Sequence, residues 1–276
     1  MDQHLHCGRY VLGLAEPLIM GIVNVTDDSF SGDGLGGDAE RAIAHGLRLV
    51  EEGAHLLDIG GESSRPGAPP VSARQELVRL LPVLAGLRDC GVPLSVDTLK
   101  AEVMREVLAA GADLINDIAA LQAPGALEAL AASRAGVCLM HMQGEPGNMQ
   151  QAPDYVDVVG EVAGFLAQRV QVAVDAGIAA ERIVVDPGFG FGKTLEHNLA
   201  LLRQLTVLKA IGRPLLVGLS RKSMLGLLTG RDVGERVHAS NAAALLALQR
   251  GAAIVRVHDV AATRDAIAVW NAVEER

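Results

Sequence analysis

An α/β fold is predicted by this sequence, and within that class a single (β/α)8 barrel of the TIM type with an N-terminal β-hairpin. Three observations predict it. Helical stretches end at a glycine that leads straight into a short apolar run, as in residues 53–58, 111–116 and 251–256. These runs lack apolar–polar alternation, which is typical of parallel strands covered on both faces. Eight such runs occur, and nearly all of them end in a polar residue.

The polar ends favour a closed barrel, and the weaker alternative is an open, doubly wound sheet. A barrel collects the carboxyl ends of all its strands around one pocket, where polar side chains have a use. Consecutive ends lie 19 to 45 residues apart, which leaves room for a crossover helix each time. The expected strand ends are Asn24, Asp58, Asp97, Asn116, His141, Asp186, Gly218 and Arg256.

Amphipathic stretches predict the helices that connect these strands. They cover residues 38–52, 72–87, 99–110, 155–176, 195–210, 235–250 and 260–273. Residues 72–75 read Ser-Ala-Arg-Gln, a capping box that marks the start of the second helix. Residues 5–16 precede the first strand, and we expect them to form a hairpin that closes the barrel floor. Because no linker or low-complexity tract interrupts the chain, we expect one domain over residues 1–276.

Composition and charge exclude several classes of protein. The chain has 276 residues, of which 50% are hydrophobic and 21% charged, enough for a large core. Its 24 Lys and Arg against 33 Asp and Glu give a net charge of −9. An acidic surface repels phosphate backbones, so we expect no nucleic-acid partner. No apolar run approaches the roughly 18–20 residues of a membrane span, so we expect no membrane partner.

The cysteines and the N-terminus indicate a compartment. Cys7, Cys90 and Cys138 are odd in number, far apart and without a C-x-x-C pair. This pattern argues against a disulfide framework or a zinc knuckle and favours a reducing environment. Residues 1–7 have neither the basic nor the apolar region of a signal peptide. We therefore expect a cytoplasmic protein, and the histidine spacing indicates no transition-metal site.

Two glycine-rich segments come close to nucleotide-binding loops without matching them. Residues 32–37 contain G-x-G-x-x-G, with Asp58 lying 21 residues further on, as in a dinucleotide-binding fold. Seven residues separate this segment from the preceding strand, and Asp27, Asp28 and Asp33 place negative charge where pyrophosphate would lie. A mobile loop is the better interpretation. Residues 186–194 fail the P-loop pattern because Pro187 replaces its first glycine.

Strand-end acids and nearby aromatic residues suggest a flat, hydrogen-bonding ligand. Asp97, Asn116 and Asp186 each end an apolar run. Carboxylates in a barrel mouth are costly unless something binds them. A fused heterocycle with N–H and amino groups would pair with all three. Phe189 and Phe191 stand among glycines after Asp186, and we expect exposed rings there to suit such a ligand.

Cations collect after the second, seventh and eighth strands. Residues 60–67 offer small side chains, hydroxyls and Arg65, which suit a phosphate contact. Residues 220–223 follow the seventh strand, the usual phosphate corner of a barrel. Arg256 and His258 alternate and so point to one side of their strand. Lys193 and Lys222 lie in glycine- or serine-rich segments, which makes both candidates for a functional role.

These motifs together resemble the dihydropteroate synthase family of folate-pathway transferases. The resemblance extends from about residue 18 to residue 258 and rests on segments 21–31, 58–63, 95–98, 116–117, 186–193, 220–223 and 256–259. It implies a barrel enzyme, usually homodimeric, that uses Mg²⁺ and is a target of sulfonamides. Its two small-molecule substrates would be 7,8-dihydropterin-6-ylmethyl diphosphate and para-aminobenzoate, and its products 7,8-dihydropteroate and pyrophosphate.

The resemblance also implies the ligands of each part of the site. The implied pterin pocket consists of Asp97, Asn116, Asp186 and Lys222. The implied diphosphate ligands are Ser64, Arg65, Arg256 and His258. The implied aminobenzoate contacts are Ser64, Pro66, Phe191, Lys222 and Ser223. Asn24 matches the Mg²⁺ contact, and His141 is interpreted as structural support.

The chain departs from the family pattern at three places. Ser64 stands where the family usually has Thr, which predicts a looser contact to the aminobenzoate ring. Asp27 stands where Pro is usual, which predicts a more mobile first loop. Residues 32–34 read Gly-Asp-Gly in place of Asp-Gly-Gly, so the role of Phe30 stays open.

The implied chemistry is displacement of diphosphate from a methylene carbon by an aryl amine. We expect Mg²⁺ and the cations to stabilise the leaving group, and Asp97 and Asp186 to stabilise positive charge that spreads into the pterin. Two alternatives stay open. One is a pterin-binding methyltransferase-like domain, against which residues 220–223 and the Phe-rich segment argue. The other is a non-catalytic paralogue that binds pterin without turnover.

Overall fold

The computed structural model describes residues 4–25, 39–63 and 70–274. Within them, eight parallel strands pair in the order β8-β7-β6-β5-β4-β3-β10-β9. A parallel bridge between Val185 and Leu215 joins the two ends of this sheet, so the barrel closes and the open-sheet alternative is wrong. The strands are β3 (Leu18–Asn24), β4 (Leu56–Gly60), β5 (Leu94–Asp97), β6 (Leu114–Asp117), β7 (Gly136–Met140), β8 (Ile183–Asp186), β9 (Leu216–Val217) and β10 (Ile254–Val257).

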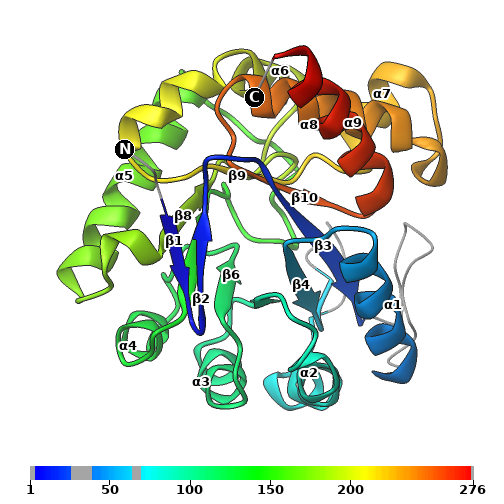
Figure 1. The fold of residues 1–276 in the computed structure, drawn as a ribbon. Coiled ribbons are helices and arrows are strands. Elements are labelled where there is room, and N and C mark those ends of the chain that lie inside the picture. Colours follow the sequence, from blue (N-terminus) through cyan, green and yellow to red (C-terminus); the bar gives the residue numbers. More distant parts are fainter. Residues whose placement is uncertain (1–3, 26–38, 64–69, 275–276) are drawn as a thin grey trace.

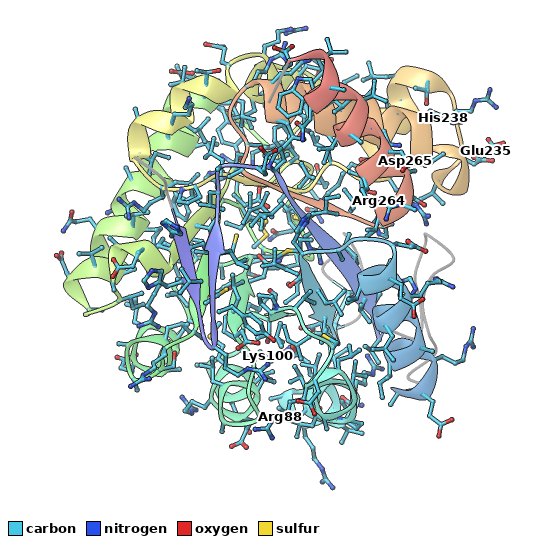
Figure 2. All side chains as sticks on the ribbon, viewed as in Figure 1. Arg88, Lys100, Glu235, His238, Arg264 and Asp265 are labelled. Carbon is cyan, nitrogen blue, oxygen red and sulfur yellow. The ribbon has the colours of Figure 1, made fainter. Side chains whose placement is uncertain are left out.

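Helices surround the barrel on its outer face (Figure 1). They are α1 (Ala39–Glu51), α2 (Ala73–Leu87), α3 (Ala101–Ala109), α4 (Ala126–Ala131), α5 (Val158–Asp175), α6 (Leu195–Arg203), α7 (Ser223–Thr229), α8 (Val237–Gln249) and α9 (Val260–Val273). Short 3-10 turns are η1 (Ala180–Arg182), η2 (Leu205–Ile211) and η3 (Val233–Glu235). Charged side chains of the outer elements, such as Glu235, Arg264 and Asp265, lie at the periphery (Figure 2).

Most predicted helices are confirmed, and the differences have local causes. The capping box forms at Ser72, whose side chain accepts from the Gln75 backbone N–H. The helix predicted over residues 195–210 is wrong in its second half, because α6 ends at Arg203 and η2 continues as a 3-10 turn. Helices α4 and α7 were not predicted, since six and seven residues are too few to show a helical period.

The predicted hairpin is confirmed, and it fills the floor of the barrel. Strands β1 (His4–Cys7) and β2 (Tyr10–Gly13) pair antiparallel. Leu5 and Cys7 are fully buried against apolar side chains from the barrel strands, such as Leu114. A Cβ at Gly136 would lie 3.1 Å from the Cβ of Cys7, so the hairpin approaches the β7 backbone closely. The hairpin therefore closes the amino-terminal end of the barrel.

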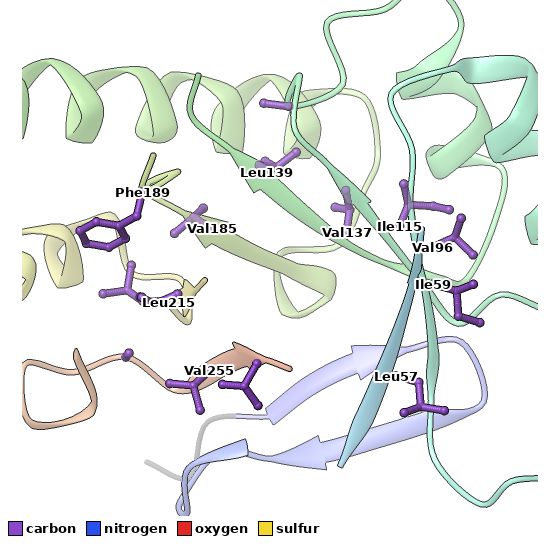
Figure 3. Packing of buried hydrophobic residues seen from close by; sticks show 14 of the residues in the cluster. Leu57, Ile59, Val96, Ile115, Val137, Leu139, Val185, Phe189, Leu215 and Val255 are labelled. Atoms are coloured by element: carbon purple, nitrogen blue, oxygen red, sulfur yellow. The ribbon is translucent and has the colours of Figure 1, made fainter. Parts of the chain in front are cut away.

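The main hydrophobic core lies between the barrel and its helices. Figure 3 shows Leu57, Val96, Ile115 and Val137 from neighbouring strands within one continuous cluster. Phe189 belongs to the same cluster and is only 1% exposed, so the prediction of an exposed ring at this position is wrong. Among the described residues, no helix combines the length and the apolar character needed to cross a membrane.

Candidate active site

A cavity of about 700 Å³ lies at the carboxyl ends of the barrel strands. Nine predicted site residues line it, namely Asn24, Asp97, Asn116, Asp186, Phe191, Lys222, Ser223, Arg256 and His258. The other predicted residues, Ser64, Arg65 and Pro66, lie outside the described residues, as do Asp27 and Phe30. Side chains far apart in the sequence therefore share one cavity, because parallel strands present their carboxyl ends to the same rim.

Asp58 connects several polar groups beneath this cavity. It lies within β4 and is fully buried. One carboxylate oxygen accepts from the Ser95 hydroxyl at 2.5 Å, and the other accepts from Asn116 Nδ2 at 3.0 Å and Arg256 Nε at 2.6 Å. The sequence pattern predicts Asp58 at a strand end without a role in the site. The signal that could have found it is a carboxylate inside an otherwise apolar strand.

The bond to Asp58 fixes the orientation of the Asn116 amide. The carboxylate can only accept, so the Asn116 NH₂ must face it and the Oδ1 must face the other way. Oδ1 is buried and, within the described part of the chain, has no hydrogen-bond partner. A buried acceptor without a donor is costly. A residue that lines the cavity therefore carries an acceptor that lacks a donor.

Asp97 and Asp186 add two more acceptors with unusual ionisation. Burial raises the pKa of Asp97 to about 7, although the Arg256 guanidinium favours its charged form. Burial also raises the pKa of Asp186 to about 6, against a hydrogen bond from the Gly188 backbone and the charge of Lys222. Asp186 is buried and Asp97 half-buried, so both have lost much of the solvation that bulk water provides. A ligand with several N–H donors would replace that solvation.

Arg256 is held between two carboxylates. Its Nε lies 2.6 Å from Asp58 Oδ2, and its Nη2 lies 3.2 Å from Asp97 Oδ2. The guanidinium thus belongs to the same polar network as the predicted pterin residues. Its predicted contact with diphosphate stays a prediction. His258 accompanies it at the cavity, and its Nδ1 lies 2.9 Å from the Ser220 hydroxyl.

The segment after β8 brings both of its phenylalanines to the lining of the cavity but buries Phe189 more deeply than Phe191. Gly188 and Gly190 adopt left-handed φ values of +68° and +78°, which reverse the chain direction between the two rings. Phe189 therefore enters the core, whereas Phe191 stays at the cavity. The Lys222 ammonium lies 4.2 Å from the Phe191 ring centroid, in a cation–π contact. Phe191 and Lys222 form one wall of the site.

Neighbouring basic residues keep this wall in place. Arg221 pairs with Asp259 at 2.7 Å, and its own φ is +57°, in the left-handed region. Arg236 donates to the Arg221 carbonyl at 3.1 Å. Together these contacts fix the turn that carries Lys222. Arg221 and Lys222 both line the cavity, but the Arg221 guanidinium is already paired with Asp259.

Asn24, the predicted Mg²⁺ contact, carries an amide oxygen that a divalent cation could use. Its side chain lines the cavity at the end of β3. Among the described residues, no group of three or more His, Cys, Asp or Glu side chains could hold a metal ion. Mg²⁺ commonly takes one or two protein oxygens and completes its shell with water and substrate phosphates. One amide oxygen beside a cavity of about 700 Å³ is compatible with that mode of binding.

Comparisons with known proteins identify the family. A family profile described as "Pterin binding enzyme" matches residues 20–258. A dihydropteroate synthase of Neisseria meningitidis serogroup C is 54% identical over 279 residues, covering 99% of each chain. The Yersinia pestis dihydropteroate synthase structure with a sulfonamide drug complex has a TM-score of 0.95 and 48% identity over 99% of each chain. The Burkholderia cenocepacia enzyme complexed with 7,8-dihydropteroate has a TM-score of 0.91 and 54% identity, covering 99% of this chain and 97% of that one.

The chain belongs to the dihydropteroate synthase family of pterin-binding enzymes. Membership confirms the resemblance found in the sequence, and the barrel is the fold of the family's solved structures. Near-complete coverage in both directions means that this chain and those relatives match over their whole lengths.

Several cavity residues of this dihydropteroate synthase family member were missed by sequence analysis. Met149 and Gln150 line the cavity from the segment between β7 and α5, which carries none of the recognised motifs. Glu62 also lines it, pairs with Lys100 and accepts from the Val71 backbone N–H at 2.8 Å. The cavity contacts of Met149 and Gln150 depend on tertiary packing and leave no pattern in the sequence, whereas Glu62 lies in the recognised segment 58–63.

Proposed function

We propose that this chain condenses 7,8-dihydropterin-6-ylmethyl diphosphate with para-aminobenzoate to form 7,8-dihydropteroate and pyrophosphate in folate synthesis. One observation carries the proposal: Asn116, whose amide is oriented by Asp58 and whose buried Oδ1 has no partner among the described residues, lines the same cavity as Asp97 and Asp186. The aminopyrimidine edge of a pterin carries several N–H donors on one rigid plane. These three acceptors suit that edge, because each buried oxygen then gains a donor.

The aminobenzoate would lie on the other side of the cavity, along the wall formed by Phe191 and Lys222. The Phe191 ring offers a flat apolar surface to the benzoate ring. The Lys222 ammonium would attract the carboxylate of para-aminobenzoate. It also favours the ionised form of Asp186, which would accept hydrogen bonds from the pterin. Ser64 and Pro66 are proposed to complete this side, and Ser223 lies at its edge.

In the reaction, the aryl amine nitrogen forms a bond to the pterin methylene carbon. The bond between this carbon and the diphosphate oxygen breaks, and pyrophosphate leaves with the electron pair. The amine then loses its proton to water. Asp97 and Asp186 stabilise positive charge that develops in the pterin, and His258 with Arg65 and Arg256 stabilise the negative charge of the leaving group.

We further propose Mg²⁺ as the cofactor, held by Asn24 together with the diphosphate oxygens and water. When bound, the ion would neutralise charge on the leaving diphosphate. Chelation by EDTA is expected to abolish turnover, and added Mg²⁺ should restore it. The variant Asn24→Ala should need more Mg²⁺ for half-maximal rate, whereas an unchanged Mg²⁺ requirement would remove Asn24 from the proposal.

A homodimer in a reducing, cytoplasmic setting completes the proposal. Large apolar side chains are exposed on neighbouring helices, including Leu227 and Leu228 on α7 and Val269 on α9. A second copy would cover such side chains. Cys7 and Cys138 are buried free thiols, which suit a reducing compartment. Analytical ultracentrifugation tests the dimer, and a monomer at micromolar concentration would reject it.

A coupled pyrophosphate-release assay tests the proposed reaction. We expect release only when both substrates and Mg²⁺ are present, and we expect sulfonamides to compete with para-aminobenzoate. Pterin binding without release would instead indicate the non-catalytic paralogue. Methyl transfer from a methyl-tetrahydropterin, with no release of pyrophosphate, would indicate the methyltransferase-like alternative.

A further inference from the structure

Lys193 is a buried cation that does not line the cavity. Lys193 directly follows the glycine-rich segment that carries Phe191, and it is only 3% exposed. Its Nζ lies 2.9 Å from the Gly188 carbonyl, 2.9 Å from the Phe191 carbonyl and 2.9 Å from His141 Nδ1. Every interaction of Nζ is therefore with the protein, and the substrates proposed above have no access to it.

Burying an ammonium group is unfavourable, so its presence needs a reason. Burial lowers the pKa of Lys193 to about 7, and the positive charge of Lys222 adds to that effect. Burial also lowers the pKa of His141 to about 3, so the imidazole beside Lys193 is neutral. A hydrophobic side chain would avoid this cost but could not bind the two carbonyls. The contacts made by Nζ are what an apolar substitute would lose.

The glycine-rich segment needs external donors because its own conformation is permissive. Gly188, Gly190 and Gly192 all have left-handed φ values, and glycine pays the largest entropy cost on ordering. Two neighbouring carbonyls are held from the β7–α5 segment: Gln150 donates to Gly190 at 2.5 Å and Tyr155 donates to Gly192 at 2.9 Å. Side chains thus hold four of the five carbonyls between residues 188 and 192.

We infer that Lys193 is the positioning residue of the aminobenzoate side of the site. By binding the backbone at Gly188 and Phe191, it holds the Phe191 ring where the Lys222 ammonium contacts it. This inference rests on the proposed function, because it assigns the Phe191 wall to aminobenzoate. It predicts that the loss of Lys193 weakens aminobenzoate binding more than pterin binding. Asp58 fixes Asn116 directly and reaches Asp97 through Arg256, whereas Asp186 is the pterin acceptor that bonds to the Gly188 backbone.

The test compares Lys193→Met with Lys209→Met. Both variants exchange a lysine for an apolar chain of similar length, and Lys209 is exposed on η2, away from the cavity. We expect Lys193→Met to raise the KM for para-aminobenzoate at least tenfold and to change the KM for the pterin diphosphate less than threefold. Lys209→Met should match the wild type. A merely structural role would lower thermal stability without separating the two KM values.

A binding measurement makes the inference independent of turnover. Calorimetry with a sulfonamide, on protein saturated with a pterin and pyrophosphate, should show at least tenfold weaker binding for Lys193→Met. If that variant does not fold, Tyr155→Phe removes only the donor to Gly192 and should weaken the same ligand about threefold. Equal weakening of pterin and sulfonamide, or no change in either, overturns the inference. Absence of wild-type pyrophosphate release with intact sulfonamide binding would reject the proposed reaction and leave this role standing.

Discussion

The two ends of the barrel are built from the same strands but bury opposite kinds of side chain, apolar at one end and polar at the other. At the amino-terminal end, Leu5 of the hairpin lies among buried apolar side chains such as Met20 and Leu216. At the carboxyl-terminal end, the strands end in polar groups such as Asp186, which is buried, and Asp97, which is half-buried. The floor minimises exposed apolar surface, whereas the mouth keeps charges out of water.

This difference shows where stability and function are located. Burial raises the pKa of Asp97 and of Asp186, so ionising them costs folding free energy. Among the described residues, the floor also has a buried carboxylate, Asp113, and it is matched by Arg9, whose Nη2 lies 2.9 Å away. The buried acid at the floor is thus satisfied within the chain, while the acids at the mouth gain full satisfaction only from a ligand.

The largest expected effect comes from exchanging one acid for its amide at each end. Asp186→Asn should lower turnover on the order of 100-fold or more and weaken pterin binding, because an acceptor for ligand N–H groups is lost. The same variant should raise the melting temperature, since a buried charge is removed. Asp113→Asn is the matched control and should lower the melting temperature, because it breaks the pair with Arg9. Wild-type turnover in Asp186→Asn would contradict the role of the mouth.

A substitution that creates a cavity in the floor should lower stability and leave substrate binding unchanged. Leu114 is fully buried among the apolar floor residues. Leu114→Ala should lower the free energy of unfolding by about 2–5 kcal/mol, which urea titration measures. At a temperature where the variant stays folded, both KM values should remain within about twofold of wild type. A selective change in KM would show that the two ends are coupled.

The smallest expected effect is a dependence of pterin binding on pH. The pKa values of about 6 for Asp186 and about 7 for Asp97 mean that both acids gain protons as the pH falls from 7 to 5. Affinity should fall roughly tenfold over this range, as protonated acids accept fewer hydrogen bonds. Fluorescence titration with 6-hydroxymethyl-7,8-dihydropterin measures this affinity with a ligand that has no diphosphate to ionise.

Because these folded-state pKa values exceed the unfolded ones, the unliganded protein should lose stability as the pH rises from about 4 to about 7. A flat binding profile would contradict the role assigned to these acids.

Much of this architecture could be predicted because the sequence repeats one local pattern at the start of several strands. A helix ends at a left-handed glycine and a buried strand follows, as at Gly53, Gly111 and Gly251, whose φ values are +106°, +102° and +98°. That pattern located the strands and, through them, the strand ends at the mouth. The shared cavity followed from the geometry of a parallel barrel rather than from any single residue.

The wrong or missing predictions concern residues whose environment does not follow from the periodicity of helices and strands. Phe189 and Phe191 are two residues apart, and the sequence alone gives them the same environment. The left-handed Gly190 between them sends one ring to the core and the other to the cavity. Asp58 was missed for a different reason: its partners Asn116 and Arg256 come from distant strands, and only the closed barrel brings them within hydrogen-bonding distance.

The closure between β8 and β9 has a consequence for motion. The two-residue strand β9 meets β8 through the Val185–Leu215 bridge, supported by a 3.0 Å bond from the Val185 N–H to the Pro214 carbonyl. The segments that carry Phe191 and Lys222 begin just beyond these strands, on opposite sides of the seam. Transient separation at this seam would part the two halves of one binding wall without unfolding either half. Hydrogen exchange at the Val185 amide would measure how often the seam opens. A ligand bound against Phe191 and Lys222 should slow this exchange.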